Sequence, residues 1–113
     1  MTEDTIFHKI LRQEIPCEEV YSDELCLAFR DIEPQAPCHI LIIPRKTIPS
    51  LNEVIKEDSN LLGHLLFIAA KIASKEGLKS WRTVINTGEE SGQTVFQLHV
   101  HLIGGRKLKW PPG

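Results

Sequence analysis

The sequence VFQLHVHLI, residues 95–103, alternates polar and apolar side chains. Successive side chains of a β-strand point to opposite faces, so this stretch predicts a strand with Gln97, His99 and His101 on one face. The other face then carries the apolar side chains Leu98, Val100 and Leu102. With a rise of about 3.3 Å per residue, the two imidazoles stand about 6 to 7 Å apart along the strand, close enough to flank one phosphate-sized group.

The rest of the hydrophobic pattern predicts two helices and four further strands. We expect a short helix over 5–13 and a long helix from 58 or 59 to 75, which Gly77 ends because glycine is free to adopt a positive φ. The expected strands cover residues 19–21, 25–30, 39–44 and 81–86. Since the strands are adjacent in sequence, the predicted fold class is α+β with a five-stranded antiparallel sheet, and not a wound parallel sheet.

Length and composition predict one globular domain covering residues 1–113. The chain has 113 residues, of which 42% are hydrophobic and 25% are charged, an ordinary balance for one modest core. Its 13 Lys and Arg are scattered and the formal net charge is -2, so we expect no binding to long nucleic acid. No apolar run approaches the ~20 residues that cross a bilayer, and no membrane association is expected.

Three cysteines, Cys17, Cys26 and Cys38, are odd in number and form no CxxC pair. This spacing argues against a disulfide framework and against a zinc ribbon. We therefore expect reduced thiols and a cytoplasmic protein. The His-x-His pair, with Cys38 next to His39, leaves a metal site as an alternative. No spacing in the chain completes a tetrahedral ligand set, so we expect neither a metal nor a cofactor.

The two histidines are suited to chemistry at phosphorus. A neutral imidazole is a competent nucleophile near neutral pH because its unperturbed pKa is about 6.5, and a second imidazole can supply or hold a proton. The loop over 87–93 precedes them. Its backbone N–H groups, the Gln93 amide, the Thr94 hydroxyl and Asn86 could bind phosphate oxygens. Taken alone, such a pair of histidines is also compatible with surface residues that have no catalytic role.

Residues 86–113, NTGEESGQTVFQLHVHLIGGRKLKWPPG, resemble the C-terminal signature of the histidine-triad (HIT) superfamily in its Hint branch. Three earlier segments also resemble their Hint counterparts: DTIFHKILRQEIP at 4–16, LAFRDIEPQAPCHILIIPRK at 27–46 and LLGHL at 61–65. The resemblance implies a HIT-like fold and a hydrolase that cleaves purine nucleoside 5'-phosphoramidates and related AMP conjugates. It also implies a nucleotidyl-histidine intermediate and release of the nucleoside monophosphate.

The resemblance assigns roles to individual positions. His99 matches the nucleophile, His101 a proton-transfer group that contacts the phosphate, and His39 a further catalytic histidine. A histidine at the start of a strand is also compatible with a satisfied core group, and that alternative stays open for His39. Asp31 matches the residue that holds the ribose hydroxyls. The base pocket matches Ile6, Phe7, Ile10, Phe29 and Ile32, and the phosphate-binding positions match Asn86, Gly92, Gln93 and Thr94.

One position departs from the family pattern, because Gln97 stands where the triad has its first histidine. Glutamine cannot titrate, although its amide can hydrogen-bond a neighbour. Since His99 is retained, we expect turnover with an altered rate or pH profile. The rival hypothesis is a nucleotide-binding regulatory or scaffold protein without turnover, and Gln97 is the feature in its favour.

The tail over residues 106–113 is expected to act as an arm in a symmetric homodimer. Trp110 lies close to the C-terminus with no local element to bury it, and the prolines at 111 and 112 favour an extended conformation. In the Hint branch, two sheets join into a ten-stranded dimer and the tail tryptophan lies near the other subunit's leaving-group pocket. The resemblance therefore implies that each subunit completes its partner's site.

Overall fold

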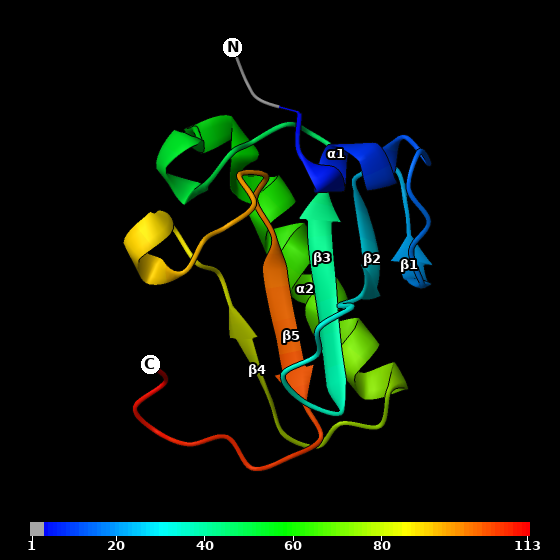
Figure 1. Cartoon of the computed structure of the whole chain (residues 1–113), viewed down its shortest axis with the longest axis vertical. Coiled ribbons are helices and arrows are strands. Elements are labelled where there is room, and N and C mark those ends of the chain that lie inside the picture. The colour runs from blue at the N-terminus through cyan, green and yellow to red at the C-terminus, as the bar shows by residue number, and fades with distance from the viewer. Residues whose placement is uncertain (1–3) are drawn as a thin grey trace.

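The computed structural model describes residues 4–113 and has a five-stranded antiparallel sheet, as the sequence predicted (Figure 1). The strand order is β1-β2-β3-β5-β4. The strands are β1 (Glu19–Ser22), β2 (Cys26–Arg30), β3 (Cys38–Pro44), β4 (Trp81–Val84) and β5 (Val100–Gly104). The last strand therefore lies between β3 and β4, and its register places His101 opposite Leu41.

Among the described residues, two α-helices accompany the sheet at the expected places. Helix α1 (Ile6–Leu11) is capped by the Thr5 side chain and is shorter than predicted, because Gln13 already adopts a left-handed φ of 63°. Helix α2 (Ser59–Lys75) matches its prediction, and Gly77 beyond it has a φ of 76°. Short 3-10 turns add η1 (Leu51–Glu53), η2 (Lys56–Asp58) and η3 (Glu89–Ser91). Within residues 4–113, no helix has both the length and the apolar character that a membrane span requires.

The sheet is covered on both faces, so its strands alternate between two apolar clusters. Helix α2 lies behind the sheet in Figure 1, and α1 lies in front of its upper end. The cluster on the α2 side includes Ile40, Ile42, Leu65, Ile68, Val100 and Leu102. The cluster on the α1 side consists of Phe7, Ile10, Leu27, Phe29, Leu41 and Ile43. Because strand side chains alternate, His39 and His101 fall on the α1 side.

The strand predicted over 95–103 begins only at Val100, so the prediction that Gln97 shares a strand face with the two histidines is wrong. The residues before Val100 bond instead to the connection that follows β3. The Leu98 N–H, for example, donates to the Ile48 carbonyl at 2.7 Å. The alternation of the sequence continues through this segment, but the period of two describes side chains only where the backbone forms a regular strand.

Candidate active site

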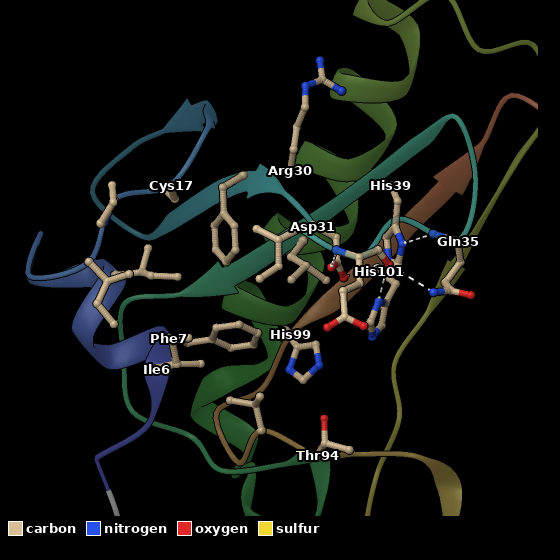
Figure 2. Close-up of a pocket in the computed structure, with 18 residues that line it drawn as sticks. Ile6, Phe7, Cys17, Arg30, Asp31, Gln35, His39, Thr94, His99 and His101 are labelled. Atoms are coloured by element: carbon tan, nitrogen blue, oxygen red, sulfur yellow. Dashed lines mark hydrogen bonds and ion pairs between the residues drawn. The ribbon is translucent and has the colours of Figure 1, made fainter.

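A cavity of about 440 Å³ opens on the α1 side of the sheet, with apolar side chains at one end and histidines at the other (Figure 2). Every residue that the resemblance matched to nucleoside binding lines it: Ile6, Phe7, Ile10, Phe29, Asp31 and Ile32. His39, His99, His101 and Thr94 line it as well. Phe7 and Phe29 are buried walls, whereas Ile32 is 90% exposed at the rim. The fold thus gathers most of the predicted site residues around one space.

Three imidazoles form the polar end of the cavity. His39 comes from β3 and His101 from the neighbouring β5, while His99 lies just before β5. The ring centroids of His99 and His101 are 5.0 Å apart, and those of His39 and His101 are 5.2 Å apart. The first pair is closer than the spacing of about 6 to 7 Å predicted from the strand rise, and His99 lies just outside the regular strand.

Hydrogen-bond partners assign the tautomers of His39 and His101. The Gln35 backbone N–H donates to His39 Nδ1 at 3.0 Å, so the neutral His39 ring carries its proton on Nε2. This Nε2–H donates to His101 Nδ1 at 2.9 Å. His101 therefore carries its own proton on Nε2 and presents an N–H donor, while His39 orients it from behind.

The orientation of His99 is set by its own loop. Its Nδ1 lies 2.8 Å from the Gln97 carbonyl oxygen, which can only accept a hydrogen bond, so Nδ1 carries the proton. The unprotonated Nε2 is then available as a nucleophile. Phe7 packs edge-on against the ring with the centroids 4.9 Å apart, and His99 is only 7% exposed. The imidazole is therefore held in one orientation.

Burial favours the neutral form of all three imidazoles. It is the largest cause of the lowered pKa of His39, which the Asp31 charge partly offsets. Burial also lowers the pKa of His99, against the opposing effect of the hydrogen bond to the Gln97 backbone. At His101, burial and then the neighbouring His99 and His39 lower the pKa to about 4. A neutral His99 is the form that a nucleophile requires.

The same pKa shifts predict a loss of stability in mild acid. Unfolded histidine titrates near pH 6.5, so between that pH and about 4 the unfolded chain binds more protons at His101 than the folded chain does. The free energy of unfolding should therefore be highest above about pH 6.5 and fall as the pH decreases. Urea unfolding at about pH 7.5 and about pH 5 measures the change in the free energy of unfolding. Between these two pH values, His101→Gln should lose less stability than wild type. Equal losses in the two proteins would contradict the assignment.

Asp31 lies between the apolar wall and the histidines in Figure 2. Its Oδ2 is 3.4 Å from His39 Nε2, and its Oδ1 accepts the Glu33 backbone N–H at 2.8 Å. Among the described residues, two groups place metal-ligand atoms within 4.8 Å of one another: Asp31, His39 and His101, and Asp23, Cys26 and His64. Hydrogen bonds within each group already account for the close approach. The expectation of no metal site stays a prediction.

The predicted phosphate-binding positions divide into two sets. Thr94 lines the cavity beside His99 (Figure 2). Asn86 and Gly92 lie against each other, since a Cβ on Gly92 would be 3.7 Å from Asn86 Nδ2, and neither lines this cavity. Gly92 has a φ of 100°, which glycine adopts without strain. The phosphate role of these positions stays a prediction.

Two glutamines, Gln93 and Gln97, do not line the cavity. The Gln93 amide accepts the Gly88 N–H at 2.9 Å and donates to the Pro49 carbonyl at 2.7 Å, so it is not free to bind phosphate as predicted. Gln97 is 0% exposed and does not line the cavity. Replacing the first histidine of the triad therefore removes no titratable group from the space where substrate would bind.

Sequence reasoning missed one group that matters for the site, the Gln35 backbone N–H that sets the His39 tautomer. No residue pattern signals such a donor, because a backbone N–H is independent of the side chain. Leu41 and Val95 also line the cavity. Leu41 could have been found from its place two residues after His39, on the same face of the predicted strand.

Comparison with known proteins identifies the family. The HIT domain family matches residues 12–108. An uncharacterized HIT-like protein of Synechococcus elongatus is 60% identical over 114 residues, covering 100% of both chains. The purine nucleoside phosphoramidase of Escherichia coli is 52% identical over 110 residues, covering 96% of this chain and 92% of that protein. The crystal structure of a HIT family hydrolase from Legionella pneumophila has a TM-score of 0.95 at 48% identity, covering 97% of this chain and 100% of that chain. The chain therefore belongs to the HIT domain family and is similar almost throughout its length to HIT family hydrolases.

Proposed function

We propose that this protein hydrolyses purine nucleoside 5'-phosphoramidates and related AMP conjugates and releases the nucleoside monophosphate. The observation that carries the proposal is the geometry of His99, whose unprotonated Nε2 belongs to a cavity that also contains the N–H donor of His101. The E. coli relative named as a purine nucleoside phosphoramidase supports the same chemistry.

The regions of the cavity fit the parts of a nucleotide. Phe7 and Phe29 form an edge-to-face pair with centroids 5.7 Å apart, and they offer a wall on which a purine can pack. Asp31 adjoins this wall and can accept hydrogen bonds from ribose hydroxyls. The phosphoryl group then lies between the two reactive histidines, near the Thr94 hydroxyl. Apolar contact discriminates between similar groups by only a few kcal/mol, so we expect both purine bases to bind.

In the first step, His99 Nε2 attacks the phosphorus and forms a new P–N bond. The bound phosphoryl anion favours the charged form of the adjacent His39–His101 pair. His101 Nδ1 takes up one proton from solvent when substrate binds, and the His39 Nε2–H then turns from His101 to Asp31 Oδ2, 3.4 Å away. His101 donates its Nε2 proton to the leaving nitrogen as the P–N bond of the substrate breaks, and the amine departs. The nucleotidyl group is now on His99, whose Nδ1–H still donates to the Gln97 carbonyl.

In the second step, water attacks the phosphorus of the nucleotidyl group. The His39–His101 pair, now neutral, accepts a proton from this water as a general base. The bond between phosphorus and His99 Nε2 breaks, which returns the neutral imidazole and releases the nucleoside monophosphate. The pair has regained the proton it donated, and the sum of the two steps is hydrolysis of one P–N bond by one water.

The direct test is incubation of the purified chain with adenosine 5'-phosphoramidate, followed by chromatography for AMP. We expect AMP release in proportion to the protein added. Denaturation in alkali, where phosphorus bonded to histidine persists, should trap a mass increment of one nucleotidyl group on His99. AMP binding without AMP release would instead support the nucleotide-binding scaffold. Gln97, the feature that favours this rival in the sequence, does not line the cavity.

We also propose a cytoplasmic location for this activity. All three cysteines are free thiols, and two of them, Cys26 and Cys38, are buried. Free thiols persist in a reducing compartment. Fractionation of cells that express the full chain, with an antibody to it, would test the location.

The tail supports a further part of the proposal, a symmetric homodimer whose subunits complete each other's sites. Trp110 is 81% exposed in the isolated chain. The Arg82 side chain donates to the Lys109 carbonyl at 2.9 Å and ties the tail to β4, an edge strand of the sheet. A large exposed aromatic side chain beside an open sheet edge favours contact with another protein surface. Joining two sheets on this side gives the expected ten-stranded dimer.

Deleting residues 109–113 should lower kcat/KM on the order of tenfold or change the preference among leaving groups, because the tail contacts the leaving group of the partner's substrate. The measurement is kcat/KM for phosphoramidates of ammonia, an alkylamine and an aromatic amine. AMP binding is the control, and it should be unchanged. Full activity in a chain that sediments as a monomer at micromolar concentration would refute the shared site, as would unaltered kinetics on all three substrates.

A further inference from the structure

The Gln97 side chain is a buried link between the loop that carries His99 and the connection that follows β3. Its Nε2 donates to the Pro44 carbonyl at 3.1 Å and to the Lys46 carbonyl at 2.8 Å. Its Oε1 accepts the Ile48 N–H at 3.0 Å. Both N–H groups and the oxygen of the amide are in use, and the residue is 0% exposed.

The backbone next to this amide holds the candidate nucleophile. The Gln97 carbonyl accepts the His99 Nδ1–H at 2.8 Å. The following residue, Leu98, donates its N–H to the Ile48 carbonyl at 2.7 Å. Ile48 is therefore bound through both its N–H and its carbonyl by two successive residues of the loop. Any shift of Gln97 relative to the connection would move the carbonyl that orients the His99 ring.

A second buried amide fastens the same two segments. Gln93 is 2% exposed, and its Nε2 donates to the Pro49 carbonyl at 2.7 Å. Leaving a buried donor or acceptor without a partner destabilises the fold, because the group has lost its hydrogen bonds to water. Both ends of the loop segment over 93–97 are thus held firmly to the connection over 44–49.

An amide matches this environment better than the side chains that could replace it. Two carbonyl acceptors and one N–H donor surround the Gln97 side chain. An amide offers two N–H groups and one acceptor oxygen. A neutral imidazole offers one donor and one acceptor, and would leave one carbonyl without a partner. A carboxylate offers no donor at all.

We propose that Gln97 is a positioning residue for His99. Its side chain fastens it to the connection over 44–48, and its backbone carbonyl, held in place in this way, fixes the orientation of the His99 ring. This inference rests on the proposed function, in which His99 attacks phosphorus. It predicts an effect on the chemical step and little effect on nucleotide binding. The base wall of Phe7 and Phe29 comes from α1 and β2, elements outside this hydrogen-bond network.

The decisive comparison is Gln97→Glu with Gln13→Glu, the same change at an exposed residue that does not line the cavity. A carboxylate at position 97 cannot donate to the two carbonyls, whereas its protonated form regains one donor. We expect kcat of Gln97→Glu to be about tenfold below wild type near pH 8. The ratio to wild type should recover as the pH falls toward about 6, with the Kd for AMP within about twofold of wild type. Gln13→Glu should match wild type throughout.

Gln97→His provides a second measure without adding a buried carboxylate. Its kcat should fall by about three- to tenfold with AMP binding retained, because one carbonyl loses its partner. Two spectroscopic readouts accompany the kinetics in both variants. Hydrogen exchange at the Ile48 N–H should accelerate, and the ¹⁵N shifts of the His99 ring should show that the Nδ1–H tautomer is no longer fixed.

Wild-type kcat in both variants would overturn the inference. Loss of AMP binding together with kcat in both variants would also overturn it, since the amide would then support the whole fold and not the orientation of His99. If the wild type itself releases no AMP, the proposed function fails instead. The positioning role would in that case still be decided by the His99 ring ¹⁵N shifts in wild type and variants.

Discussion

Replacing His99 with alanine should reduce kcat for AMP release by about 10⁴-fold or more while changing the Kd for AMP by less than about tenfold. The reason is the separation of roles within the cavity. The ring supplies the attacking Nε2 and contacts one edge of the wall through Phe7. The remaining wall and Asp31 are left in place to bind the nucleoside.

The measurement combines steady-state kinetics on adenosine 5'-phosphoramidate with AMP binding by calorimetry. His64→Ala is the matched control, because His64 lies on α2 and does not line the cavity. The control should keep turnover, and the nucleotidyl adduct should disappear only from His99→Ala. Turnover close to wild type in His99→Ala would show that another group attacks phosphorus.

Replacing His101 with glutamine should lower kcat by about 10²–10⁴-fold and leave KM within about threefold of wild type. Glutamine can still donate a hydrogen bond to a phosphoryl oxygen, but it cannot transfer a proton to the leaving nitrogen. His39, whose Nε2 lies 2.9 Å from His101 Nδ1 in the wild type, then has no neighbouring imidazole with which to exchange a proton. The loss should therefore fall on the chemical step.

Leaving groups of different basicity separate this role from a purely structural one. An amine that departs without protonation needs no acid, so the deficit of His101→Gln should shrink as the leaving amine becomes less basic. A series of aromatic amines with different ring substituents measures the trend in both proteins. A deficit that stays constant across the series would remove His101 as the proton donor.

Much of the fold could be predicted from the sequence, because neighbouring side chains decide each element. The apolar run before Pro44 predicted β3, and the stripe ended by Gly77 predicted α2. Alternation around His101 correctly placed Val100 and Leu102 on the face opposite the histidine, and in the structure this is the α2 side. These features depend on spacing within a few residues, which is what a sequence displays.

The surroundings of Gln97 could not be predicted, because they depend on residues far away in the chain. The Ile48 N–H that bonds its amide is 49 positions away. The alternating pattern continued through Gln97, so a local rule extended the strand past its true start at Val100. The hydrogen bond from the Gln93 amide to the Pro49 carbonyl could not be predicted for the same reason, because the two residues are 44 positions apart. The cavity residues were matched by resemblance, and their roles are still predictions.

Because β5 lies between β3 and β4, the proposed activity would depend on complete assembly of the sheet. His39 and His101 are 62 positions apart, and their hydrogen bond exists only after the last strand has docked against β3. Contacts between distant parts of a chain form slowly, because the entropy of closing the loop opposes them until the pairing is made. A chain that lacks a docked β5 would not contain the His39–His101 hydrogen bond. Under the proposed mechanism such a chain would release no AMP, and activity would begin only when β5 has paired with β3.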